Sequence, residues 1–253
     1  MLTVTNHKLE IFSPAPMKIV QIADLHKRIF GKNNEKLVQK IAKIKPDYIF
    51  LCGDMITRDC EDFRGLGDLL GALVKICPVF YAPGNHELEI SEKFRWAFYK
   101  TVTENGVFYL ENSTLIPDVL DRKVCIAGLT LRKENYRVNG KYDALEPYTA
   151  ADINAALGQK KNFTILIAHN PLFMDVYADW GADLVLSGHV HGGVVRLPFL
   201  GGLLSPERKF FPKYSAGIYR EGGTVMSVTR GLGKFRLFNP PEIVVLEIFP
   251  KNR

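Results

Sequence analysis

Short runs of consecutive apolar residues alternate, in the first third of the chain, with longer segments in which apolar residues recur every three or four positions. The runs at Lys18–Ala23, Tyr48–Cys52 and Val79–Tyr81 are typical of buried strands, because a strand covered on both faces has no polar side. The longer segments at Asn34–Lys45 and Phe63–Ile76 predict helices. This alternation indicates strands joined by helical crossovers, and therefore a largely parallel sheet.

The rest of the chain continues the alternation less regularly. Residues 91–104 and 150–157 predict helices, whereas the short apolar runs within residues 107–130 suit a second sheet. Residues 131–147 are rich in charged residues, Asn and Gly, which is typical of a surface connection. Three further strands are expected at Phe163–Ala168, Leu184–Leu186 and Ile243–Phe249.

No repeat, low-complexity tract or linker divides the sequence, so we expect one domain over residues 1–253. The 47% hydrophobic and 24% charged residues are ordinary for a globular protein and argue against disorder. The net charge of +6 is mild and spread along the chain, so no dedicated nucleic-acid binding is expected. An anionic substrate, an anionic membrane surface and a plain solvated face all fit that charge.

The cysteines and the apolar runs indicate the compartment. Cys52, Cys60, Cys77 and Cys125 show no Cys-x-x-Cys spacing, and we interpret them as reduced core residues. No apolar run approaches the roughly 20 residues that cross a bilayer. The N-terminal residues also lack the apolar core of a signal peptide. The sequence therefore predicts a cytoplasmic protein.

Polar side chains that can bind metals follow each predicted strand of the first third. Asp24 and His26 come after the first strand, and Asp54 comes after the second. Asn85 and His86 follow the third. Because ligands of parallel sheets collect beyond the carboxyl ends of the strands, we expect these side chains to lie close together.

Two later strands also end in histidines. His169 follows Phe163–Ala168, and the segment Gly188-His189-Val190-His191-Gly192 follows Leu184–Leu186. If that segment is extended, its two imidazoles point to one side and form a chelating pair. A hydrogen-bonded structural role explains any one of these histidines, but not their gathering at successive strand ends. Carboxylate, amide and imidazole ligands without thiolate favour manganese, iron or zinc.

The motif order Asp-x-His, Gly-Asp, Gly-Asn-His-Glu, an isolated His after a strand, and Gly-His-x-His resembles the calcineurin-like metallophosphoesterase superfamily. The resemblance runs from about Lys18 to His191. The segments Leu197–Gly202, Phe211–Gly217 and Arg230–Gly233 are similar to a bacterial subgroup of often membrane-associated phosphodiesterases. The resemblance implies an α/β fold, a four-layer α/β/β/α sandwich of two mixed sheets flanked by helices.

The same resemblance implies two divalent metal ions as cofactors. The ligands of the first ion would be Asp24, His26, Asp54 and His191. The ligands of the second would be Asp54, Asn85, His169 and His189, so that Asp54 bridges. Two ions about 3.5–4 Å apart can share a hydroxide that attacks phosphorus. His86 holds no metal in the family pattern and is expected to protonate the leaving group. A purely structural role for His86 is the alternative.

The expected activity is therefore that of a metal-dependent phosphodiesterase with a phosphate ester as substrate. Two dications and two aspartates leave two positive charges, which a hydroxide and one diester anion would balance. A monoester dianion would need a further cation, such as Arg230. A phosphomonoesterase and a non-catalytic metal-binding scaffold are the alternatives. The chain departs from the family pattern at Thr57, where a second acidic residue is common. Asp59 follows two positions later, so the support of the ligands is expected to differ.

Apolar and basic residues adjoin one another beyond the histidine pair, from Leu197 to Leu204 and then from Arg208 to Phe211. One interpretation is a lip that faces a membrane, makes peripheral contact with it and admits a lipid-linked phosphate ester. The alternative is a loop packed over the core.

Overall fold

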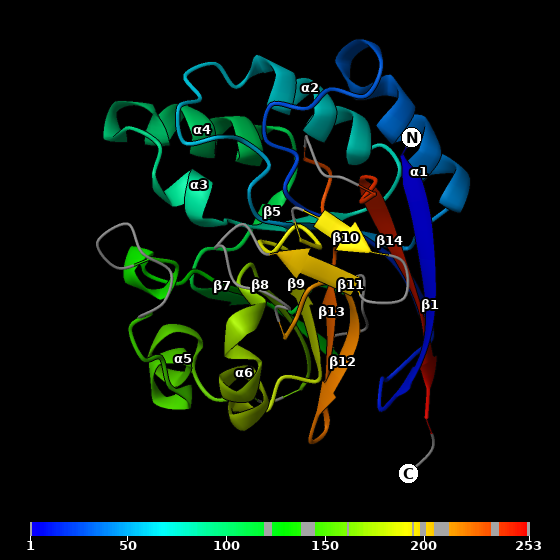
Figure 1. The fold of residues 1–253 in the computed structure, drawn as a ribbon, viewed down its shortest axis with the longest axis vertical. Helices are drawn as coiled ribbons and strands as arrows, with labels where there is room; N and C mark the ends of the chain where they lie inside the picture. The colour runs from blue at the N-terminus through cyan, green and yellow to red at the C-terminus, as the bar shows by residue number, and fades with distance from the viewer. Residues whose placement is uncertain are drawn as a thin grey trace.

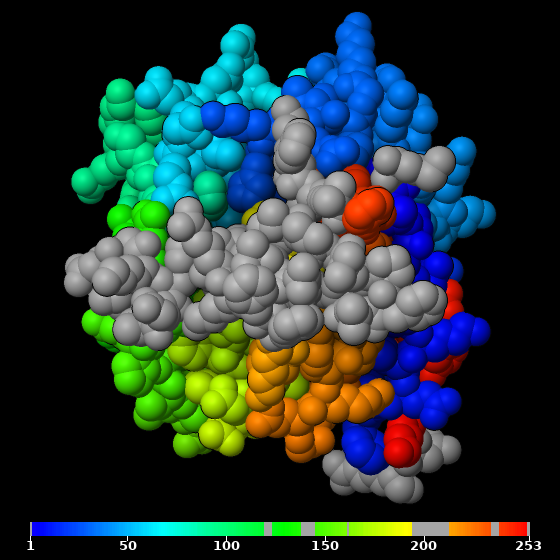
Figure 2. All heavy atoms as spheres, in the orientation of Figure 1, coloured from blue at the N-terminus to red at the C-terminus, as the bar shows by residue number. Residues whose placement is uncertain are grey.

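The computed structural model describes residues 2–118, 123–137, 145–160, 162–193, 195–197, 201–204, 213–233 and 238–251. Two six-stranded sheets lie between two sets of helices (Figure 1). The face shown in Figure 2 has blue and cyan residues of the N-terminal part at the top and green to orange residues of later segments at the bottom, with further blue and red residues along the right side.

The first sheet is mixed. Its strands are, in spatial order, β1 (Thr3–Ile11), β14 (Glu242–Pro250), β2 (Met17–Ile22), β3 (Tyr48–Cys52), β4 (Val79–Ala82) and β5 (Phe108–Tyr109). Neighbouring strands are parallel except β14 and β2. The strands β2, β3 and β4 therefore deliver their carboxyl ends to the same edge, as the sequence predicts.

The second sheet is also mixed. Its strands are, in spatial order, β12 (Gly217–Glu221), β13 (Thr224–Val228), β9 (Leu184–Ser187), β8 (Phe163–Ala168), β7 (Val124–Leu129) and β6 (Ser113–Leu115). The four inner strands are parallel, and both edge pairs are antiparallel. A separate ribbon pairs β10 (Val195–Leu197) with β11 (Gly201–Leu204).

Helices cover the outer faces of both sheets. The helices beside the first sheet are α1 (Glu35–Ile44), preceded by the 3-10 turn η1 (Lys32–Asn34), α2 (Arg64–Leu73) and α4 (Glu92–Glu104). Those beside the second are α5 (Ala150–Leu157) and α6 (Met174–Trp180). The one-turn helices are α3 (Asn85–Leu88), η3 (Lys133–Asn135) and η4 (Pro171–Phe173). Within the described part of the chain, no helix has the length and hydropathy needed to cross a membrane.

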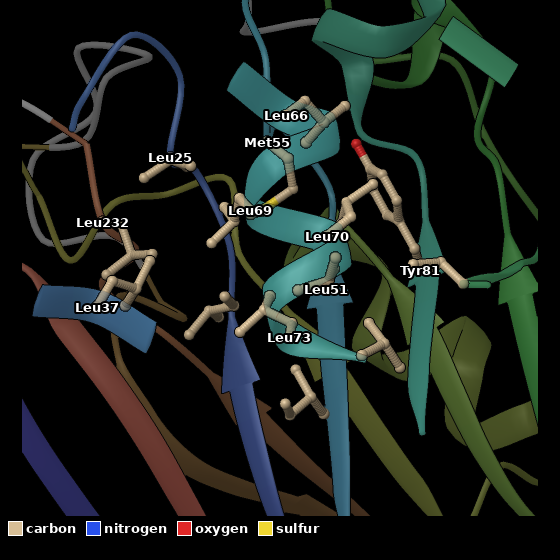
Figure 3. Packing of buried hydrophobic residues seen from close by; sticks show 14 of the residues in the cluster. Leu25, Leu37, Leu51, Met55, Leu66, Leu69, Leu70, Leu73, Tyr81 and Leu232 are labelled. Atoms are coloured by element: carbon tan, nitrogen blue, oxygen red, sulfur yellow. The ribbon is translucent and has the colours of Figure 1, made fainter. Parts of the chain in front are cut away.

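Alternating side chains of each inner strand divide the core into layers, because successive residues of a strand point to opposite faces. In β3, Ile49 and Leu51 pack against the helices, whereas Phe50 packs between the sheets. Figure 3 shows Leu51 near Leu70 and Leu73 of α2 in the helix-facing layer. A third cluster joins the second sheet to α5 and α6. These three apolar layers separate four structural layers, which confirms the predicted α/β/β/α sandwich.

The structure differs from the sequence prediction at four places. The strand β1 and the hairpin of β12 and β13 were not expected, and neither was α6. The segment with the histidine pair is not extended, since His189 and His191 have φ angles of 67° and 53°. The proposed membrane lip lies largely outside the described residues. Only Leu197 at the end of β10 and the backbone of β11 belong to the described part.

Candidate metal centre

The loops that follow five strands of both sheets meet at one place. Asp24 follows β2, and Asp54 follows β3. Asn85 begins α3 just after β4. His169 comes directly after β8, and the pair of histidines follows β9. The centre therefore lies where the carboxyl ends of the two sheets come together.

The structure brings the predicted ligands into overlapping groups. Within each group the ligand atoms all lie within 4.8 Å of one another. These groups are Asp24, His26 and His191, then His26, Asp54 and His86, and finally Asp54, His169 and His189. The first and third groups reproduce the two ligand sets expected from the sequence, apart from Asn85 and the sharing of Asp54. Asn85 is itself buried beside them, at 7% exposure.

Five of the seven predicted ligands have a left-handed backbone, a conformation that non-glycine residues rarely adopt. The residues with positive φ are Asp24, His26, Asp54, His189 and His191. In this conformation a loop turns sharply at the residue that carries the functional side chain. The surrounding hydrogen bonds hold these turns, as in the bonds from Asp24 N to Gly53 O (3.0 Å) and from His26 N to Asp54 O (3.1 Å).

The loops approach so closely that glycine is required at one of the turns. A Cβ atom on Gly84 would lie 2.8 Å from Asp54 N and 2.9 Å from His169 Cδ2, and nearer still to the Asp54 carboxylate. Such contacts are too short for any side chain. Gly84 therefore allows Asn85 to reach the centre.

The imidazole of His169 is oriented as a metal ligand requires. Its Nδ1 lies 2.6 Å from the carbonyl oxygen of Cys52, so Nδ1 carries the proton and donates it there. Its Nε2 is buried, makes no hydrogen bond to the described residues, and faces Asp54 Oδ2 at 3.3 Å and Asp24 Oδ1 at 3.7 Å. The side-chain oxygen of Asn85 is likewise buried without a hydrogen bond among the described residues.

Electrostatics in the centre favour a bound cation. Burial lowers the pKa of His169, but the neighbouring Asp54 outweighs burial and raises the pKa to about 10. Burial alone would raise the pKa of Asp54, yet His169 holds it far below its usual range. Asp54 and His169 thus each favour the charged form of the other. Since a metal ion can take the place of a proton on His169 Nε2, the donor set fits divalent cations.

Glu87 supports the loops that carry the ligands, a role that was not predicted from the sequence. Its carboxylate accepts hydrogen bonds from the backbone N–H groups of Asp54 and Gly84, both at 2.8 Å, and from Ile56 at 3.2 Å. The hydroxyl of Tyr81 donates a fourth bond at 2.8 Å. Glu87 therefore ties the loop after β3 to the loop after β4. Its place in the Gly-Asn-His-Glu motif was the available signal.

His86 lies at the accessible side of the centre. Its ring centroid is 4.6 Å from that of His26, and its Nε2 is 3.8 Å from Asp54 Oδ2. The His86 side chain is 21% exposed, whereas those of Asp54 and His169 are essentially inaccessible. Burial, which is the largest influence, lowers the pKa of His86 to about 4. The ring can therefore meet a bound substrate from the solvent side.

Two residues singled out in the sequence form ion pairs away from the predicted roles. Asp59 forms an exposed ion pair with Lys27, so Glu87, and not Asp59, supports the ligand loops. The guanidinium of Arg230 is paired with Glu242 at 2.7 Å and is only 15% exposed. The positive charge of Arg230 is thus already balanced by a carboxylate.

A cluster of carboxylates and imidazoles at the junction of two sheets in an α/β/β/α sandwich defines a class of metal-dependent phosphoesterases. Comparison with protein families matches residues 17–193 to the family described as "Calcineurin-like phosphoesterase". The chain therefore belongs to the calcineurin-like phosphoesterase family, whose members are metal-dependent hydrolases of phosphoesters.

Individual relatives agree with this assignment. The chain is 29% identical to phosphodiesterase YaeI of Escherichia coli over 96% of its own length and 86% of that protein. It is also 29% identical to the uncharacterized metallophosphoesterase YkuE of Bacillus subtilis, covering 93% of this chain and 80% of the relative. The solved structure of TT1561 from Thermus thermophilus shares the fold, with a TM-score of 0.53 and 12% identity, covering 86% of this chain and 91% of that one.

Proposed function

We propose that this chain is a phosphodiesterase that uses two divalent cations. The observation that carries the proposal is the position of Asp54, which belongs to two groups at once, one with His26 and His86 and one with His169 and His189. A residue shared in this way is suited to bridge two ions. Asp24, His26, Asp54 and His191 would hold one ion, and Asp54, Asn85, His169 and His189 the other.

Bound cations of this kind polarise phosphoryl oxygens and activate an attacking water. The protein's own residues supply the remaining requirements. Glu87 and the left-handed turns fix the ligands before substrate arrives, which lowers the cost of orienting them. His86, on the accessible side, is placed to give a proton to the departing alcohol, because an alkoxide leaves poorly without one.

Charge favours a diester over a monoester. Two dications and the carboxylates of Asp24 and Asp54 leave two positive charges, which a hydroxide and a diester monoanion balance. Arg230 cannot add a free charge, because Glu242 accepts its hydrogen bonds. A diester is therefore the better match to the centre.

A phosphomonoesterase is the second candidate, and one observation favours it. Arg58 and Arg137 share the single carboxylate of Glu89, with Arg137 at 2.8 Å. Among the described residues this leaves one positive charge beside His86, where it would attract the second charge of a monoester. The two candidates therefore make opposite predictions for relative rates.

The test is a comparison of bis(4-nitrophenyl) phosphate with 4-nitrophenyl phosphate, using one preparation reconstituted separately with manganese, iron and zinc. We expect a higher kcat/KM for the diester, and loss of at least about a thousandfold in Asp54→Ala. Asp175→Asn, on the exposed surface of α6, is the matched control and should retain full activity. A higher kcat/KM for the monoester supports the phosphomonoesterase. Inactivity of every metal-loaded form supports a non-catalytic scaffold.

A further inference from the structure

An apolar pocket of about 230 Å³ opens directly beside the candidate metal centre. His26, one of the proposed ligands, forms part of its wall. The other walls come from the loop after β2, the loop after β3 and the first turn of α2. Its principal lining residues are Leu25, Ile29, Met55, Ile56, Cys60 and Leu66. The metal ligands do not need this space, so it requires a separate explanation.

Much of the pocket wall is apolar. Leu25, Met55 and Leu66 are buried members of the core cluster between α2 and the first sheet. Figure 3 shows these three side chains, which come from three separate segments of the chain. Ile29, in contrast, is 66% exposed and lies at the mouth. Because Ile29 is exposed, an apolar group that covers it on binding buries apolar surface, which favours binding.

The cations near the pocket are already paired, so they do not make it an anion site. Lys27 forms an ion pair with Asp59. Arg28 donates a hydrogen bond to the carbonyl oxygen of Gly233 at 2.7 Å and stacks over the ring of Phe30 at 4.9 Å. Asp62, the acidic residue of the lining, pairs with Arg64. Each charged side chain of the lining is therefore engaged by a neighbouring group. A neutral, apolar group is the ligand that this pocket fits.

The pocket lies on the side of the centre that His86 occupies. His26, in the pocket wall, is in edge contact with His86. Thr57 also lines the pocket, and the next residue, Arg58, donates its backbone N–H to His86. A group held in the pocket would therefore be attached to the oxygen that His86 is placed to protonate.

We infer that this pocket binds the leaving group of the substrate and selects diesters whose leaving alcohol is a single aryl ring. This inference rests on the phosphodiesterase function proposed above. An apolar cavity of about 150 Å³ is large enough to bind benzene, so the space here holds one ring with a small substituent. Two long acyl chains do not fit. The pocket thereby sets the KM for the leaving group without taking part in the chemistry.

Gly65 offers a way to fill the pocket without disturbing the fold. It lies in the first turn of α2 and lines the pocket, and a Cβ atom there meets nothing within 4 Å. Leucine is also a better helix former than glycine, so Gly65→Leu should fold. Gly65→Ala, which adds a single methyl group, is the matched control. Ile29→Ala removes the apolar mouth instead, at an exposed position.

The experiment compares bis(4-nitrophenyl) phosphate, followed by absorbance, with bis(2,2,2-trifluoroethyl) phosphate, followed by fluorine NMR. We expect Gly65→Leu to raise KM for the aryl diester about tenfold, and Ile29→Ala to raise it about threefold. In both variants, kcat and KM for the small diester should stay within about twofold of the wild-type values. Gly65→Ala should resemble the wild type. Unchanged aryl KM in Gly65→Leu, or equal losses for both diesters, would overturn the inference.

A binding measurement separates failure of the pocket from failure of the proposed activity. Cys60 lines the pocket, whereas Cys77 does not. We expect 4-nitrobenzyl alcohol to slow the alkylation of Cys60 by iodoacetamide in the wild type but not in Gly65→Leu, with Cys77 unaffected in both. If Cys60 is protected but the chain hydrolyses no diester, the phosphodiesterase function is refuted and the pocket remains a binding site for the aryl group. Absence of protection would refute the pocket itself.

Discussion

The backbone N–H of Arg58 donates a hydrogen bond to Nδ1 of His86 at 3.1 Å. Because Nδ1 accepts this bond, the proton of the neutral imidazole resides on Nε2, the nitrogen that faces the metal centre. A guanidinium nitrogen of Arg58 lies 3.2 Å from that Nε2, but this contact is not a hydrogen bond, because both groups are then donors. The backbone of Arg58 thus fixes the tautomer of the proposed proton donor.

Replacement of His86 by alanine should affect substrates according to their leaving group. We expect His86→Ala to lower kcat about a hundredfold or more for a dialkyl phosphate, because an alkoxide needs protonation. The loss for bis(4-nitrophenyl) phosphate should be about tenfold or less, since nitrophenolate leaves unaided. Steady-state kinetics with both substrates check this. Equal losses would assign His86 a structural role.

Gly84→Ala should lower the affinity for metal ions, because the added Cβ would be forced against Asp54 and His169. We expect at least a tenfold rise in the dissociation constant for manganese, measured by calorimetric titration. Gly223→Ala is the matched control, as a Cβ there meets nothing within 4 Å. Equal affinities in the two variants would contradict the close approach of the loops.

Glu87→Gln should destabilise the protein, because an amide cannot accept all the hydrogen bonds that the buried carboxylate accepts. We expect a loss of about 3 kcal/mol in the free energy of unfolding, measured by urea denaturation. Tyr81→Phe removes only one of these bonds and should cost about 1 kcal/mol. If Glu87→Gln costs no more than Tyr81→Phe, Glu87 does not hold the two loops together.

Glu242 should make the fold sensitive to acid. Burial raises the pKa of its carboxyl, but hydrogen bonds from Arg230 and Thr5 outweigh burial and hold the pKa below the ordinary value of 4.5. A group with a lowered folded-state pKa contributes stability above its unfolded pKa, and that contribution is lost as the pH falls below 4.5 towards the folded value.

The measurement is urea denaturation of wild type and Glu242→Gln at pH 7 and at progressively lower pH. We expect the variant to be less stable at neutral pH, with the difference shrinking below about pH 4.5. A difference that does not change with pH would show that the Glu242 carboxylate contributes no acid sensitivity.

Most strands at inner positions of the sheets could be predicted because each is a short apolar run, whereas β13 was missed because Thr224 and Ser227 interrupt its apolar residues. The bounds of β3 and β8 agree with the sequence prediction. The strand β1 was missed because it lies at an edge and its exposed positions carry polar residues such as Lys8 and Glu10. Its partner is β14, at the other end of the chain, and local sequence carries no signal for such pairing.

The gathering of the candidate ligands could be predicted because parallel strands deliver their ends to one edge. The conformation of the histidine pair could not, because His189 and His191 adopt left-handed backbones that tertiary contacts impose. The supporting roles of Glu87 and Arg58 could not be predicted for a related reason. Their roles depend on hydrogen bonds to loops far away in the sequence, which no spacing reveals.

The most direct test of the account is the metal content of the purified chain after reconstitution with manganese, measured by plasma mass spectrometry. A centre built around a shared Asp54 predicts two ions per chain in the wild type and in Asp175→Asn. In Asp54→Ala it predicts one ion or none. A wild-type chain that binds a single ion, or an Asp54→Ala variant that retains both, would contradict it.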